Sequence, residues 1–166
     1  MTSTLNAKEE ALYHSIKDLP IVSPHGHCDP SWFARNAAFA NPAGLLVTPD
    51  HYVFRMLYSQ GVPLVKLGIG APGRHANPQE VFRIFAAHWH LFLGTPTRIW
   101  LDYVLRKTLR IDTELSAATA DFIYDQIAEK LTQDAFSPRA LFESFNIETL
   151  ATTDSALDDL SHHSAI

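Results

Sequence analysis

The fold of this chain is decided by the stretch Pro20-Ile21-Val22-Ser23-Pro24-His25-Gly26-His27. The β-branched pair between two prolines predicts a short buried strand within residues 20–25 that ends in a loop. A second β-prone run, residues 147–152, follows about 125 residues later. A parallel pair of strands needs a crossover connection, and helical patterns dominate the intervening sequence. The two runs therefore predict a parallel strand pair whose crossover contains a helical insertion.

Outside the two strands, the chain has the patterns of helices and their caps. A helix is expected over residues 7–18, with Leu12, Ile16 and Leu19 at helical spacing and Pro20 after it. A polar cap residue followed by proline recurs four times. It predicts helices over residues 48–60, 77–93, 95–110 and 137–145, with Thr48 as the first cap and Glu80 closing a capping box. Another helix is expected over 116–131, with its apolar stripe on Phe122, Ile123, Ile127 and Leu131, and a last one from Asp154 to Ile166. Residues 28–47 are predicted to be irregular and 62–76 to form a loop.

Length and composition exclude several classes of protein. The 166 residues suit one domain, and the net charge of −5 argues against a nucleic-acid-binding protein. No apolar run is long enough to span a membrane, and residues 1–10 do not have the pattern of a signal peptide. The single cysteine, Cys28, cannot form an internal disulfide and is interpreted as chemically incidental. A cytoplasmic protein without a nucleic-acid or membrane partner is expected.

The pair His25 and His27 is the sharpest chemical feature. Side chains at i and i+2 of a strand point to the same face, so two imidazoles can converge on one divalent metal. Gly26 would leave room for a close approach, and Asp29 could support a ligand as a hydrogen-bond acceptor. The alternative is a pair of unrelated loop histidines, and the spacing alone does not decide between the two.

Two other histidine pairs are weaker candidates for a metal site. His88 and His90 share the i, i+2 spacing but lie within a predicted helix, where such side chains diverge by about 200°. One is expected to pack and the other to face water. His162 and His163 lie near a helix C-terminus, where surface charge or local packing is the expected role.

Two further polar clusters flank predicted helix starts. Asp50, His51 and Tyr52 fall in a helix's first turn, where backbone N–H groups attract anions, an imidazole adds a donor and a phenol can exchange hydrogen bonds with a sugar hydroxyl. A cap with an amphipathic aromatic residue is the alternative. Thr152, Thr153 and Asp154 end the second strand run and are interpreted as a helix cap.

Three ordered motifs resemble those of the uronate (glucuronate) isomerases. The first spans residues 20–30 and contains the His-Gly-His triplet, and the second spans residues 49–57 with Asp-His-Tyr. The third spans residues 145–154, followed by residues 157–160 and the pair His162-His163. The resemblance covers essentially the whole chain. One departure is Ser23-Pro24, where the family usually has an aspartate and an aromatic residue.

The resemblance implies an amidohydrolase-like metal-dependent barrel that interconverts D-glucuronate with D-fructuronate and D-galacturonate with D-tagaturonate. It implies that His25 and His27 are metal ligands, commonly to zinc. It implies further that His51 binds the uronate and that Tyr52 assists proton transfer between C2 and C1 through an enediol. The expected fold class is α/β, the N-terminal part of a (β/α)8 barrel that is mostly helical as it stands.

A complete (β/α)8 barrel needs about 200 residues or more, so residues 1–166 are expected to form a single, incomplete barrel domain. Its parts would be an N-terminal helix and first strand (1–30), a helical insertion (31–145) and a second strand with its helix (146–166). A third metal ligand is missing, so little isomerase activity is expected of this chain alone. Another metal-dependent hydrolase of the superfamily and a non-catalytic helical module with a partner are alternatives, and homo-oligomer formation stays open.

Overall fold

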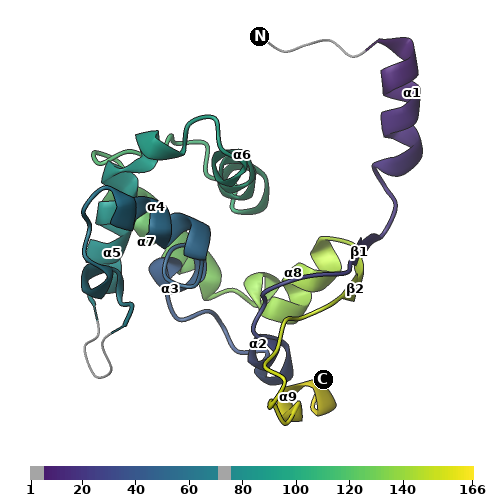
Figure 1. Cartoon of the computed structure of the whole chain (residues 1–166). Helices are drawn as coiled ribbons and strands as arrows, with labels where there is room; N and C mark the ends of the chain where they lie inside the picture. The colour runs from purple at the N-terminus through teal and green to yellow at the C-terminus, as the bar shows by residue number, and fades with distance from the viewer. Residues whose placement is uncertain (1–5, 71–75) are drawn as a thin grey trace. The chain divides into compact units, whose positions relative to one another are not determined.

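The computed structural model of the chain describes residues 6–70 and 76–166 (Figure 1). They fall into two compact units, one formed by Met1–Ala37 with Pro138–Ile166 and the other by Ala38–Ser137. The described residues are mostly helical, with one small parallel sheet, as the sequence predicts. No helix among them is both long and apolar enough to cross a membrane. The interpretation of residues 1–166 as one incomplete barrel domain stays a prediction.

The first unit is built around the two strands, which lie side by side in Figure 1. Ile21 pairs with Ile147 and Ser23 with Leu150 in parallel register, which confirms the predicted pairing and its helical crossover. One of its helices, residues 138–144, contacts the second strand, and the helix over residues 30–35 packs against that helix and against the last one. The elements are α1 (Ala7–Ile16), β1 (Ile21–Ser23), α2 (Pro30–Arg35), α8 (Pro138–Ser144), β2 (Ile147–Leu150) and α9 (Ser161–Ser164).

Burial in the first unit differs from the sequence prediction. Ile21 and Val22 of β1 are 48% and 59% exposed, so the prediction of a buried strand is wrong. A two-stranded sheet has little to cover its faces, which leaves these side chains in contact with solvent. Helix α1 forms as predicted, with an Asn6–Glu9 capping box that stabilises its start. Its apolar side chains are nonetheless exposed, Leu12 by 68% and Ile16 by 61%.

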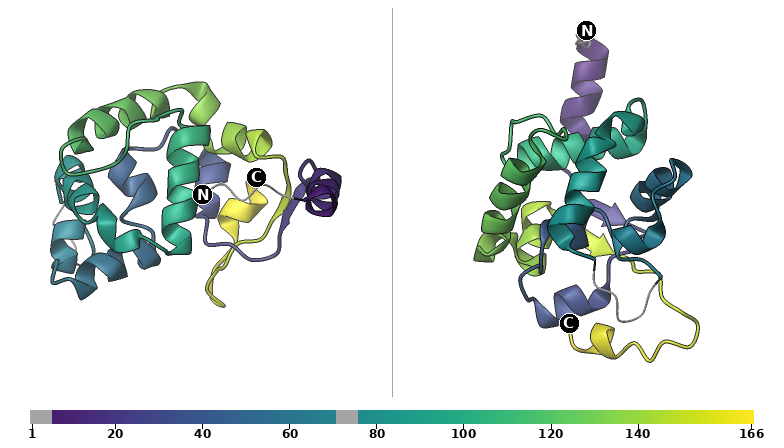
Figure 2. Two further views of the ribbon diagram at one scale, coloured as in Figure 1. Left: turned by 90° about the horizontal axis from the view of Figure 1, so that it is seen from above. Right: turned by 90° about the vertical axis from the view of Figure 1, so that its left-hand side faces the viewer.

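The second unit contains the hydrophobic core. Helices α3 (Pro42–Leu46), α5 (Pro78–Ala87) and α7 (Ala120–Leu131) pack against one another (Figure 2). Phe82, Phe85 and Ile123 are among the buried residues of the core. Phe85 makes edge-to-face contacts with Trp89 and Phe92, a geometry that aromatic pairs favour. The elements are α3 (Pro42–Leu46), α4 (His51–Ser59), η1 (Leu64–Leu67), α5 (Pro78–Ala87), η2 (Trp89–Phe92), α6 (Pro96–Tyr103), η3 (Val104–Thr108), α7 (Ala120–Leu131) and η4 (Asp134–Phe136).

Two helices occupy the region predicted to be irregular, residues 28–47. Asp29 accepts a hydrogen bond from the Ser31 N–H at 2.8 Å and caps α2. Asn41 accepts one from the Gly44 N–H at 2.7 Å and caps α3. Each cap is followed by proline, so the local signal is the one that predicted the other helices. Asp29 therefore caps a helix, and the support that its carboxylate could give to a metal-ligating histidine stays a prediction.

Several predicted boundaries are also wrong. Asp50, not Thr48, caps α4, and the Thr48 hydroxyl bonds to the Leu67 carbonyl instead. Helix α5 ends at Ala87, and α6 ends at Tyr103 before a π-helical segment. Phe122 is 55% exposed and does not belong to the buried stripe of α7. The predicted loop over residues 62–76 contains the short η1 helix, and residues 71–75 lie outside the described residues.

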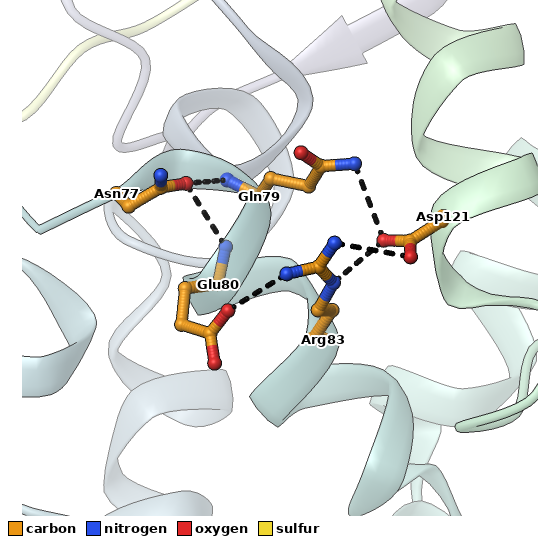
Figure 3. A network of polar contacts seen from close by, with 5 residues as sticks. All are labelled: Asn77, Gln79, Glu80, Arg83 and Asp121. Atoms are coloured by element: carbon orange, nitrogen blue, oxygen red, sulfur yellow. Dashed lines mark hydrogen bonds and ion pairs between the residues drawn. The ribbon is translucent and has the colours of Figure 1, made fainter.

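A polar network joins α5 to α7 on the surface of the second unit (Figure 3). Arg83 binds Asp121 through two nitrogens, with its Nε 2.7 Å from Asp121 Oδ1, and its third nitrogen binds Glu80. Glu80 thus pairs with Arg83, while Asn77 caps the helix by accepting from the Gln79 and Glu80 N–H groups. The Arg83 hydrogen bonds hold the pKa of the Asp121 carboxyl below its usual value of 3.8.

The lowered pKa gives this ion pair a defined pH dependence. A carboxyl whose pKa falls on folding stabilises the protein above its usual pKa, near 3.8, and loses that effect as the pH falls through the folded-state pKa. We expect Asp121→Asn to reduce the free energy of unfolding at pH 7 and to have no effect below the folded-state pKa, measured by urea titration.

Asp125→Asn, a change to another exposed acid of α7, is the matched control and should cost less at pH 7. Equal losses from the two variants would show that the bond to Arg83 contributes nothing specific.

Candidate functional site

The His25–His27 pair follows β1 directly. The strand ends at Ser23, so both histidines lie in the turn beyond it and not within the strand. Their Nε2 atoms nevertheless approach to 3.0 Å, with the ring planes 83° apart. The carboxyl ends of parallel strands share one edge of a sheet, so the turn lies beside the residues that follow β2. The structure therefore brings the two imidazoles together, as the spacing predicts, through a turn.

The donor atoms fit two positions of a metal site. Zinc is bound by histidine nitrogens at about 2.0–2.1 Å, which places two tetrahedral ligands roughly 3.3 Å apart. The observed 3.0 Å between the Nε2 atoms is close to that spacing and also suits an N–H···N hydrogen bond. Within residues 6–70 and 76–166, no group of three or more His, Cys, Asp or Glu side chains could hold a metal. The pair could thus supply two ligands of a metal site.

Cys28 lies next to this pair but has the properties of a packed thiol. Its side chain is partly buried, and this burial raises the pKa of the Cys28 thiol above its usual value. The interpretation of Cys28 as chemically incidental stays a prediction.

Gly26 lies against the end of β2. A Cβ atom at this position would stand 2.7 Å from the Ala151 carbonyl oxygen, closer than real side chains come to backbone. The Thr153 hydroxyl donates to the Gly26 carbonyl oxygen at 2.8 Å. The requirement for glycine thus comes from the close approach of two segments that are far apart in sequence.

The residues after β2 form a hydrogen-bonded cluster instead of the predicted cap. The Thr152 hydroxyl lies 2.6 Å from Asp154 Oδ2 and 2.8 Å from His163 Nε2. Helix α9 begins only at Ser161, so Asp154 does not cap it and the predicted helix from 154 to 166 is wrong. His163 packs locally, which was one of the roles expected for it. This cluster was not predicted, although Thr152, Asp154 and His163 all belong to the third sequence motif.

A cavity of about 360 Å³ adjoins this cluster within the first unit. Phe33, Phe142 and Leu150 provide apolar walls, and Thr152 and His163 contribute polar atoms to it. Arg139 also lines the cavity, but its Nε donates to the Phe33 carbonyl and its backbone N–H to Asn36. Arg139 therefore ties α8 to α2.

His51 and Tyr52 open α4 in the second unit. Their ring centroids are 4.1 Å apart, with His51 half-buried and Tyr52 66% exposed. Asp50 accepts hydrogen bonds from the Tyr52 and Val53 N–H groups at 2.8 and 3.3 Å. The Asp50 carboxylate thus binds the N–H groups of Tyr52 and Val53, which the sequence predicted to be available to an anion. A substrate-binding role for His51 therefore depends on its imidazole and not on these amides.

Tyr52 also borders an apolar cavity of about 560 Å³ in the second unit, with Met56, Phe92 and Trp100 among its walls. The phenol combines an exposed hydroxyl with an apolar surrounding. Each predicted pair, His25 with His27 and His51 with Tyr52, is therefore brought together within its own unit.

For His88 and His90 the expected burial of one and exposure of the other is confirmed, but the predicted divergence of the side chains is wrong, because the α-helix ends just before them. His88 caps the C-terminus of α5, and its Nδ1 lies 2.8 Å from the Ile84 carbonyl oxygen. His88 is half-buried and His90 exposed. Their ring centroids are 6.4 Å apart and nearly parallel, which does not direct two nitrogens at one ion.

Comparison with known proteins identifies the family. A family model described as glucuronate isomerase matches residues 2–166. The chain belongs to the glucuronate isomerase family. The chain is 56% identical over 155 residues to the uronate isomerase of Rhizorhabdus wittichii and 57% identical over 155 residues to that of Sphingopyxis alaskensis. Each match covers 93% of this chain and 33% of the relative, so the chain spans about a third of the length of these curated relatives.

Two solved structures of the glucuronate isomerase family are similar to this one. The crystal structure of glucuronate isomerase from Caulobacter crescentus superposes with a TM-score of 0.87 at 52% identity. Uronate isomerase from Thermotoga maritima superposes with a TM-score of 0.80 at 28% identity. Each comparison covers 93% of this chain and 33% of the other. These matches confirm the resemblance stated from the three motifs.

The close approach at Gly26 predicts an intolerance to any side chain there. We expect Gly26→Ala to reduce the free energy of unfolding by about 1–3 kcal/mol, because the new methyl must push the histidine turn away from Ala151. Urea denaturation followed by circular dichroism measures this change. Gly44→Ala is the control, since the three nearest atoms to its methyl belong to the Asn41 side chain. A larger cost at Gly44 than at Gly26 would contradict the proposed clash.

The geometry also predicts that the two histidine pairs differ in metal uptake. Even the loss of an outer partner of a ligand costs about 10- to 100-fold in metal affinity, so His25→Ala or His27→Ala should weaken Zn²⁺ binding at least tenfold. His88→Ala and His90→Ala should leave it nearly unchanged. Calorimetric Zn²⁺ titration of the five proteins measures the affinities. Equal losses from both pairs would show that convergence of the Nε2 atoms is irrelevant.

Proposed function

We propose that this chain provides the metal-binding and proton-transferring parts of a uronate isomerase with a (β/α)8 barrel. The convergence of the His25 and His27 Nε2 atoms at the carboxyl end of β1 carries the proposal. In barrel enzymes the catalytic residues lie at the carboxyl ends of the strands, and here both strands end beside the histidine turn. Family membership supplies the substrate class, a uronate sugar.

His25 and His27 would hold a divalent metal, with zinc the proposed ion. Two neutral imidazoles leave coordination positions for a further protein ligand and for substrate. When bound, the metal supplies Lewis acidity toward the oxygen atoms of the sugar. The Thr153 hydroxyl binds the turn that carries both imidazoles to the segment after β2, and Gly26, which has no Cβ, lets the two segments approach closely.

His51 would bind the uronate, and Tyr52 would move the proton. The His51 imidazole can donate a hydrogen bond to a carboxylate or a sugar hydroxyl. The exposed phenol of Tyr52 can both accept and donate a proton, as transfer between C2 and C1 of an aldose–ketose pair requires. The Asp50 cap holds the first turn of α4 and thereby the backbone that carries both side chains.

The activity is tested in a chimaera. Residues 1–166 replace the matching third of the Caulobacter crescentus enzyme, and ketose formation from D-glucuronate is measured. We expect the chimaera to form D-fructuronate, and Tyr52→Phe to lower kcat by about 10²- to 10⁴-fold, because removing one acid–base group costs that much.

Tyr58→Phe is the matched control, since Tyr58 is a similarly exposed phenol on the same helix, α4, and should retain kcat. A folded chimaera that forms no ketose would refute the proposed activity. Unchanged kcat in the Tyr52→Phe protein would refute the role given to the phenol.

A further inference from the structure

Two hydroxyl groups hold the carbonyls of the histidine turn. The Ser23 hydroxyl donates to the His25 carbonyl oxygen at 3.2 Å, and the Thr153 hydroxyl donates to the Gly26 carbonyl oxygen at 2.8 Å. Ser23 lies two residues from its acceptor, whereas Thr153 lies 127 residues from Gly26. The Thr153 bond therefore connects the segment after β2 to the segment after β1.

The acceptor of this bond bears directly on the orientation of His27. The Gly26 carbonyl shares one planar peptide unit with the His27 N–H. A hydrogen bond that fixes the carbonyl direction therefore also fixes the plane from which the His27 Cα and side chain emerge. A metal site needs its ligands held within about 0.5 Å of their working geometry, and outer hydrogen bonds usually provide that restraint.

The donor itself is held in place. Ala151 lies two residues before Thr153, and its N–H donates to the Ser23 carbonyl at 2.9 Å, which extends the ladder beyond β2. Thr152, the residue between them, is bound through its hydroxyl to Asp154 and His163. The Thr153 residue is exposed, so its side chain does not contribute to a core and the hydroxyl bond is its described polar contact.

We propose that Thr153 is a positioning residue that sets the orientation of His27, and thereby the spacing of the two imidazole nitrogens, through the Gly26 carbonyl. This inference rests on the proposed function, in which the histidine pair holds a metal. It assigns to Thr153, the third residue after β2, a role in a site whose metal ligands lie in the first-strand motif.

The test uses the full 166-residue chain and two readouts. Thr153→Val keeps the side-chain shape without the hydroxyl, and Thr153→Ser keeps the hydroxyl. Hydrogen exchange of the amides of residues 25–28 reports the order of the turn without metal, and calorimetric Zn²⁺ titration reports affinity. We expect Thr153→Val to accelerate exchange in this turn and to weaken Zn²⁺ binding roughly three- to tenfold, which corresponds to one net hydrogen bond. Thr153→Ser should keep both the exchange rates and the Zn²⁺ affinity close to those of the wild type.

Thr132→Val is the matched control, because its hydroxyl also donates to a carbonyl, that of Glu129 at 2.7 Å, in the second unit. It should change neither readout. Unaltered exchange and affinity in Thr153→Val, or a failure of Thr153→Ser to restore them, would overturn the inference. A wild-type chain that binds no Zn²⁺ would refute the metal site of the proposed function, while the exchange readout would still decide whether Thr153 orders the turn.

Discussion

The main-chain hydrogen bonds between β1 and β2 bring together segments that the sequence separates by more than 120 residues. The Ile21 N–H donates to the Asn146 carbonyl at 2.8 Å, and the Ala151 N–H to the Ser23 carbonyl at 2.9 Å. Because the two strands are parallel, both end at the same edge of the sheet. The histidine turn after β1 and the threonine-rich segment after β2 consequently become neighbours.

This pairing explains why the candidate site residues of the first unit gather at one edge of its sheet. Gly26 tolerates the approach of the Ala151 carbonyl only because it has no Cβ. The turn is then held by hydroxyl groups on two sides, and the His25 and His27 nitrogens meet at 3.0 Å. The Ser23 hydroxyl, which donates to the His25 carbonyl, is an uncharged restraint on this turn.

Helices with local start signals were predictable from the sequence, and their burial was not. The Asn77–Pro78 and Thr95–Pro96 caps form where expected because donor and acceptor lie within three residues of each other. The same signal at Asp29–Pro30 and Asn41–Pro42 was overlooked among neighbouring breakers. In contrast, Leu12 and Phe122 sit at helical spacing yet remain exposed, because burial depends on which other elements pack against that face.

The sequence by itself determined the family, the two strand-forming runs and the histidine-containing motifs, since each is encoded by residues that are near one another in the chain. Only the tertiary structure decided what restrains them. The contacts of Thr153 with Gly26 and of Arg139 with Asn36 join residues more than 100 positions apart. Such contacts depend on which backbone segments the strand pairing places side by side, and no local spacing of residue types encodes that placement.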